Sequence, residues 1–139
     1  MPPELVTWFV DENNLFLARR LAERVENVVY PGHSDLPEIP RRTPDDQWLP
    51  IVGQKRMIVL TRDARIRYRP VEKARWLEHG VRGFVLTAAG NMRIDDQLSL
   101  LGDHWPAMTR WIDHNPDGPW MLAVTRSEIR ALLPEATAG

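Results

Sequence analysis

Five short apolar segments, separated by longer stretches with helical patterns, constrain the fold of this chain more than any other feature. They occupy residues 6–10, 28–30, 57–60, 84–86 and 120–124. The segment 57–60 (MIVL) has no polar residue, which is typical of a parallel strand covered on both faces. Because strands and helices alternate along the chain, the pattern predicts an α/β fold with a central parallel sheet of about five strands and helices on both sides.

Residues 15–25 carry a clear helical pattern after the first predicted strand. Apolar residues recur there at i, i+3, i+4 and i+7, which places them on one face of a helix. That face is formed by Ala18, Leu21, Ala22 and Val25. We expect Asn13 or Asn14 to cap the start of this helix, because asparagine is favoured at that position.

A proline-rich stretch, residues 31–44, precedes the second predicted helix. It holds four prolines and a glycine, and so long a loop in a small domain is expected to be functional or mobile. Residues 43–46 (TPDD) predict a helix start, with the threonine as N-cap, the proline at the first helical position and both aspartates in the first turn. That helix should end near residue 52.

Two more helices are expected in the second half of the chain. The first begins at a proline, covers residues 70–80 and should bury Val71, Ala74 and Leu77. The second is long and covers residues 94–112. It contains a proline at position 106, where we expect a kink because proline cannot donate the helical hydrogen bond.

The end of the chain predicts one last helix. Thr125 and Glu128 have the spacing of a capping box, in which each side chain bonds the backbone of the other. This pattern predicts a helix that reaches residue 133, followed by a frayed tail over residues 134–139. The 139 residues fit one domain, 1–139, with a core over about residues 6–133.

Composition excludes several classes of protein. The chain has no cysteine, so it has neither disulfides nor thiolate zinc sites. No apolar run approaches the roughly 20 residues that cross a bilayer, so no membrane association is expected. The start, MPPELV, lacks the basic and apolar regions of a signal peptide. These features favour a cytoplasmic protein.

Basic residues concentrate in one part of a chain whose net charge is only −1. Eight of them lie between Lys55 and Arg75, against two acids, Asp63 and Glu72. Most are arginines, whose planar guanidinium suits phosphate. The run is either a solvated surface or a binding surface for a phosphate-rich partner.

Acidic residues follow two of the predicted strands. Asp11 and Glu12 come directly after the first strand, Asp63 follows the third, and Asp45 and Asp46 begin the helix between them. Ligands of open α/β sheets bind beyond the carboxyl ends of the strands, so we expect these acids at one edge. Several carboxylates in one pocket need partial protonation or a cation, and hard oxygen ligands select Mg²⁺ or Mn²⁺.

Several of the acidic and aromatic residues can also be explained by a purely structural role. Asp46 has the position of an ordinary helix-start charge, and Asp63 could be a turn residue. The histidines show no metal-binding spacing. The tryptophans at core positions favour a core or a partner interface over base stacking, and those that remain exposed make a homodimer or a partner groove plausible.

Three motifs together resemble the PIN-like ribonucleases, and among them the VapC-type toxins of toxin–antitoxin pairs. The motifs are FVDEN at residues 9–13, TPDDQWLP at 43–50 and VLTRDARIR at 59–67. The closest similarity is to the subgroup with a D-E-N start and a T-x-D after the middle strand. This resemblance implies a three-layer α/β/α fold with a central parallel sheet.

The resemblance also implies a set of site residues. The metal-binding and catalytic acids of the family fall on Asp11, Asp45 and Asp63, with Glu12 as a secondary catalytic candidate. Asp45 is preferred to Asp46 because it matches P-D-x-x-W. Related sequences often have a second acid in T-x-D-x-D-F; here Arg65 stands in its place. A fourth family acid is best matched by Glu72, so the number of metal ions stays open.

The activity implied is that of a Mg²⁺- or Mn²⁺-dependent endoribonuclease that acts as the toxin of a toxin–antitoxin pair. It would cleave structured cellular RNA, with four arginines holding the RNA backbone, and a cognate antitoxin would inhibit it. Those arginines are Arg62, Arg65, Arg67 and Arg69.

Two alternatives remain open. A response-regulator receiver domain also has acids after its first strand and a phosphorylated aspartate after its third, here Asp63. It needs a lysine after the fifth strand, where this chain has Arg126. The other alternative is a PIN-like binding module that has lost its catalysis, which the missing second acid of the T-x-D-x-D pattern would explain.

Overall fold

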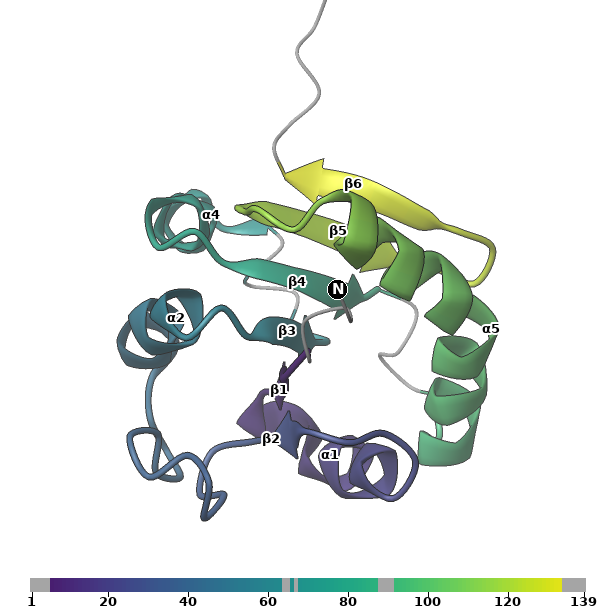
Figure 1. The fold of residues 1–139 in the computed structure, drawn as a ribbon, viewed down its shortest axis with the longest axis horizontal. Helices are drawn as coiled ribbons and strands as arrows, with labels where there is room; N and C mark the ends of the chain where they lie inside the picture. The colour runs from purple at the N-terminus through teal and green to yellow at the C-terminus, as the bar shows by residue number, and fades with distance from the viewer. Residues whose placement is uncertain (1–5, 64–65, 67, 88–91, 134–139) are drawn as a thin grey trace, which may run out of the picture.

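The computed structural model describes residues 6–63, 66, 68–87 and 92–133, and these form one sheet with helices on both faces (Figure 1). The strands are β1 (Trp8–Val10), β2 (Val28–Val29), β3 (Ile58–Thr61), β4 (Arg82–Leu86), β5 (Trp120–Val124) and β6 (Ile129–Leu133). Their order is β2-β1-β3-β4-β5-β6. The first five are parallel, as predicted, and β6 runs antiparallel to β5 at the edge.

The helices form two outer layers. The 3₁₀ turn Glu12–Asn14 leads into α1 (Leu15–Ala22), which lies beside α5 (Ile94–His114) on one face of the sheet (Figure 1). On the other face lie α2 (Asp45–Gln54) and α4 (Pro70–Glu78). This arrangement confirms the predicted three-layer α/β/α fold. The long helix α5 continues through Pro106.

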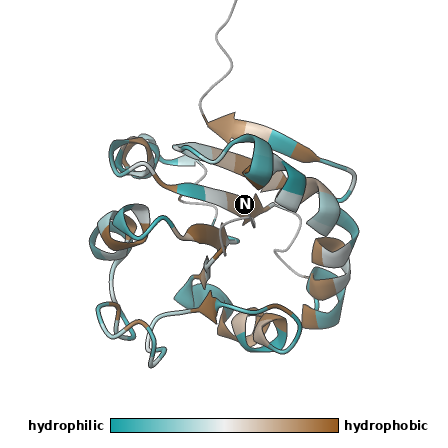
Figure 2. Ribbon diagram, in the orientation of Figure 1, coloured by the Kyte–Doolittle hydropathy of each residue, from teal (hydrophilic) through white to brown (hydrophobic). Residues whose placement is uncertain are grey.

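Each face of the sheet has its own core, because successive side chains of a strand point to opposite faces. Trp8, Phe84 and Trp120 pack together under α1 and α5, with ring centroids 6.0 and 5.2 Å apart. Phe9 points to the other face and packs against Trp48 of α2 at 4.8 Å. Figure 2 shows hydrophobic residues along the central strands and largely hydrophilic loops.

The expected exposed tryptophans are not found. Four of the six are buried and two are half-buried, so the exposed tryptophans on which a homodimer or partner groove was expected are absent. The large apolar side chains that are exposed are instead Phe16, Tyr68, Val71 and Leu77.

The predicted buried face of the helix at residues 70–80 is wrong. Val71, Ala74 and Leu77 are exposed, and α4 packs through Trp76, which is fully buried. The indole Nε1 of Trp76 donates a hydrogen bond to the Trp120 carbonyl (3.0 Å). Room for this ring comes from a glycine of β4, because a Cβ built on Gly83 would lie 2.9 Å from it. One large side chain therefore determines which face of the helix is buried.

The predicted last helix is also wrong, because residues 125–133 form a tight turn and β6. The Thr125 hydroxyl accepts hydrogen bonds from the backbone N–H groups of Ser127 and Glu128, at 3.3 and 3.0 Å. The Thr125 N–H donates to the Glu128 carbonyl (2.9 Å). A threonine hydroxyl makes such local bonds at a helix start or in a turn, and here the turn lets β6 pair with the open edge of β5. The tail at residues 134–139 lies outside the described residues.

The predicted helix caps differ in detail. The hydroxyl of Thr43 does not cap α2; it donates to the Pro40 carbonyl (2.6 Å), and Pro44 occupies the N-cap position. Asn14 is the N-cap residue of α1 by position, but its side chain donates to Gln97 of α5 (3.1 Å). The long loop before α2 is packed into the core through two fully buried side chains, Leu36 and Ile39.

Candidate active site

The order of the strands places a crevice at the ends of β1 and β3. From β1 the chain passes to β2 on one side, and β3 lies on the other side. Such a reversal in a parallel sheet opens a ligand-binding crevice at the carboxyl ends of the strands. Asp11 directly follows β1 and Asp63 follows β3 by two residues, so the sheet brings both acids to this point, as predicted.

Asp11 is the most constrained acid of the site, with only 3% of its surface exposed. Its Oδ2 accepts a hydrogen bond from the Thr61 hydroxyl (2.5 Å), whose oxygen in turn accepts one from the Asp63 N–H (3.0 Å). Its Oδ1 is buried and has no hydrogen-bond partner among the described residues. A buried carboxylate oxygen without a partner is costly.

Burial raises the pKa of Asp11 from its ordinary 3.8 to about 7. Burial is the largest of several causes that this pKa of about 7 combines: the Thr61 hydrogen bond lowers it, the nearby carboxylates of Asp45 and Asp63 raise it, and the Arg62 charge lowers it. The ionised form of Asp11 is therefore under-stabilised by its surroundings. A cation bound at the free oxygen would supply the missing stabilisation.

Asp45 begins α2 and is held by a core side chain. Its Oδ1 accepts a hydrogen bond from the Trp48 indole N–H (2.9 Å), and the same indole packs against Phe9 of β1. This contact gives the P-D-x-x-W motif a physical meaning, because the tryptophan fixes the carboxylate one helical turn before it. Asp46 is exposed, whereas Asp45 is half-buried.

Glu12 is already engaged with the protein backbone. Its Oε1 accepts a hydrogen bond from the N–H of Arg42 (2.7 Å), which lies in the loop before α2. This bond ties the end of β1 to a segment thirty residues away in the sequence. Loop anchoring is thus a role for Glu12 that the sequence motif alone did not suggest.

These groups line a cavity of about 340 Å³. Its acids are Asp11, Glu12, Asp45, Asp46 and Glu72, and its cations are Arg42 and Arg75. The wall is completed by Asn13, Thr43, Pro44 and Trp48. The cavity does not extend to Asp63, which reaches Asp11 through Thr61.

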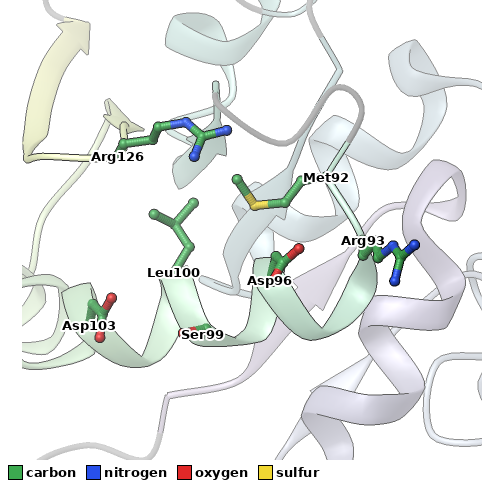
Figure 3. Close-up of a pocket in the computed structure, with 7 residues that line it drawn as sticks. All are labelled: Met92, Arg93, Asp96, Ser99, Leu100, Asp103 and Arg126. Carbon is green, nitrogen blue, oxygen red and sulfur yellow. The ribbon is translucent and has the colours of Figure 1, made fainter.

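A larger cavity of about 720 Å³ lies over the start of α5, and Figure 3 shows Arg126 reaching across it from the β5–β6 turn. Its charged lining residues, Arg93, Asp96, Asp103 and Arg126, are all exposed. The smaller cavity is the better candidate site because it contains a buried, incompletely bonded acid.

The acidic cavity fits a divalent cation in part. Among the residues that the structure describes, no three acidic or histidine side chains are grouped closely enough to hold a metal ion. The fit rests on Asp11, whose free buried oxygen and raised pKa indicate a missing positive charge. The available carboxylate oxygens are the ligands that Mg²⁺ and Mn²⁺ prefer.

The four arginines predicted to bind RNA are placed differently. Arg62 is half-buried and donates to the Asn13 carbonyl (3.1 Å) beside the cavity. Arg69 is exposed at the start of α4, and Arg65 and Arg67 lie outside the described residues. Two arginines, Arg42 and Arg75, line the cavity. Sequence reasoning missed Arg42, and it counted Arg75 in the basic run without placing it at the site.

The receiver alternative is not supported by the second half of the chain. The order β2-β1-β3-β4-β5 also occurs in flavodoxin-like folds, so strand order alone does not separate the two classes. After β5, however, the chain returns as β6 instead of continuing into a helix. Thr87 follows β4, where a receiver domain has a threonine or serine that faces its phosphorylation site, and here its hydroxyl donates to the Val124 carbonyl (3.3 Å).

Comparison with known proteins gives one match. The sequence model of a PIN like domain family matches residues 7–88, from the residue before β1 to just beyond β4. The matched segment contains the acids Asp11, Glu12, Asp45 and Asp63. Neither a curated protein nor a solved structure matches the chain. No helix in the described parts of the chain has the length and apolar character needed to span a bilayer.

Proposed function

Because this chain belongs to the PIN like domain family, whose members are generally metal-dependent nucleases, we propose that it is a metal-dependent endoribonuclease. One observation carries the proposal. Asp11, at the point where the strand order reverses, has a buried oxygen with no partner among the described residues and a pKa raised to about 7. Such a group is suited to binding a cation.

Each side chain of the site has a distinct part in this activity. Asp11 would hold Mg²⁺ or Mn²⁺, and the ion would have to draw Asp45 and Asp63 closer to Asp11 than they lie here to complete its ligands. The bound ion would activate water and neutralise charge on the phosphate. Thr61 orients the Asp11 carboxylate and Trp48 orients that of Asp45. Asp11 must lose its proton before it can bind a cation, so cation binding is coupled to proton release.

The substrate we propose is a single-stranded loop of structured RNA. Bases in an A-form duplex are hidden in a deep groove, whereas loops present them to a protein. Arg62 lies beside the cavity, and with Arg65, Arg67 and Arg69 it would contribute contacts to the RNA backbone. Such contacts give affinity and not sequence choice.

The biological role we propose is that of a toxin held inactive by a cognate antitoxin. An antitoxin arginine entering the acidic cavity could replace the charge of a metal ion, because guanidinium pairs well with carboxylates. The antitoxin should then lose affinity for a chain that carries Asp11→Ala and Asp63→Ala. Undiminished binding to that double variant would reject this mode of inhibition.

Cleavage of total cellular RNA by the purified chain tests the nuclease. We expect discrete products with Mg²⁺, none with EDTA, and none from Asp11→Asn with Mg²⁺. Asp113→Asn is the matched control, because this acid is exposed near the end of α5 and does not line the acidic cavity, and it should retain most cleavage. A folded wild-type chain that cuts no RNA with either metal would instead support a PIN-like binding module without catalysis.

A further inference from the structure

Two arginines, Arg42 and Arg75, line the acidic cavity. They come from different elements, the loop before α2 and the last turn of α4. Neither guanidinium forms an ion pair within the described part of the chain, although five acids line the same cavity. The two cations are therefore available to a ligand.

The backbone of Arg42 is held in an uncommon conformation. Its φ is +68°, in the left-handed region, which costs a residue other than glycine about 1–2 kcal/mol. The hydrogen bond from its N–H to Glu12 stabilises this conformation (2.7 Å). On either side, the loop is fixed by buried Ile39 and by the bond from Thr43 to the Pro40 carbonyl. Glu12 thus sets where the loop presents Arg42.

Arg75 is carried by a rigid element. It is half-buried, and the next residue, Trp76, is fully buried and bonded to the β5 backbone. Glu72, one turn earlier on α4, lines the cavity as well. Arg75 and Arg42 therefore approach the cavity from two elements that are each anchored to the core.

A ligand that suits this cavity must satisfy opposite charges. The buried Oδ1 of Asp11 has no hydrogen-bond partner among the described residues and suits a cation, whereas the two guanidinium groups need anionic oxygens. A phosphodiester chain with its counter-cation supplies both. We propose that Arg42 and Arg75 bind the RNA phosphates next to the cleaved one, and that Glu12 is a positioning residue for Arg42 and not a metal ligand. This inference rests on the proposed ribonuclease function.

The test measures RNA binding without cleavage. The parent protein is the full chain carrying Asp11→Asn, and the probe is a short fluorescent single-stranded RNA followed by anisotropy over a series of KCl concentrations. The slope of log K against log[salt] changes by about 0.7 for each phosphate contact to a single strand. We expect Arg42→Gln and Arg75→Gln each to reduce the slope by about that amount and to weaken binding several-fold. Arg110→Gln, on an exposed arginine near the far end of α5, should leave the slope unchanged.

Glu12 is tested by a pair of neutral substitutions in the same parent. Glu12→Gln keeps an oxygen that can accept from the Arg42 N–H, so its slope should equal that of the parent. Glu12→Ala removes the acceptor, so its slope should fall as in Arg42→Gln, and combining the two changes should give no further fall. If Glu12→Ala and Glu12→Gln give the same slope, the positioning role of Glu12 is overturned.

Two failures can be told apart. If the parent binds RNA with a steep salt dependence but Arg42→Gln and Arg75→Gln match Arg110→Gln, the phosphate contacts are wrong and the nuclease proposal stands. If the parent does not bind RNA and the wild-type chain does not cleave it, both proposals fail. A thermal melt of each variant verifies that it is folded.

Discussion

Asp11→Asn should stabilise the metal-free protein above neutral pH. The substitution keeps the size of the side chain and an oxygen for the Thr61 hydroxyl, but removes the charge. Burial raises the pKa of Asp11 from 3.8 to about 7, so the folded state holds this proton more tightly than the unfolded chain does. The stability that depends on Asp11 is therefore complete below about pH 4 and is lost as the pH rises towards 7.

The size of the effect follows from the two pKa values. Ionising Asp11 costs roughly 4 kcal/mol more in the folded protein than in the unfolded chain, at 1.36 kcal/mol per pKa unit. The wild-type protein should lose roughly 1.5 kcal/mol of its unfolding free energy at pH 5, and roughly 4 kcal/mol at pH 8. The asparagine variant has no such loss, so its advantage should grow by about 2.5 kcal/mol between these pH values.

Urea unfolding in EDTA at pH 5 and pH 8 measures this difference. Asp46→Asn is the control, because Asp46 is exposed, and its stability relative to wild type should change little with pH. Adding Mg²⁺ at pH 8 should stabilise the wild-type protein and have little effect on the Asp11→Asn variant. An asparagine variant whose stability relative to wild type is the same at both pH values would refute the argument from burial.

Other predictions follow from single contacts. Gly83→Ala should destabilise the protein by about 1–3 kcal/mol in a denaturant titration, since a Cβ there would lie 2.6 Å from a backbone oxygen of the neighbouring strand. Trp48→Phe keeps an aromatic ring but loses the N–H bond to Asp45, so Mn²⁺ titration should show several-fold weaker binding with the fold retained. Thr61→Val removes a hydrogen bond that lowers the pKa of Asp11; Mn²⁺ binding should therefore reach half of its maximum at a higher pH than in the wild-type protein.

The sequence predicted the parallel sheet because the segments 57–60, 84–86 and 120–124 are apolar without interruption, and that property needs no knowledge of distant contacts. Prediction from the sequence was wrong where the same local pattern is compatible with two different structures. The hydroxyl of Thr125 can bond nearby N–H groups at a helix start or in a turn, and the open edge of β5 decides between them. The buried face of α4 was missed for a similar reason, because Trp76 depends on the space above Gly83, in another element.

The candidate site was predictable to the extent that it depends on strand ends. Asp11 and Asp63 lie at the predicted edge, and the P-D-x-x-W motif distinguished Asp45 from its neighbour. Arg42 could not be found in this way. Its place in the cavity depends on a left-handed backbone conformation and on a hydrogen bond to Glu12, thirty positions away. Neither feature can be recognised from the residues around Arg42.

The aromatic contacts between Trp8, Phe84 and Trp120 affect when the protein can fold during synthesis. The segment that the family model matches ends at residue 88 and already contains the acids of the site. On the face under α1 and α5, however, Phe84 packs against a tryptophan of β5, which is made much later. A ribosome-bound chain that ends at β4 therefore contains the acids that follow β1 and β3. It lacks the part of the core under α1 and α5 that β5 contributes. The sheet edge that carries Asp11 and Asp63 should therefore become stable only after β5 has left the ribosome.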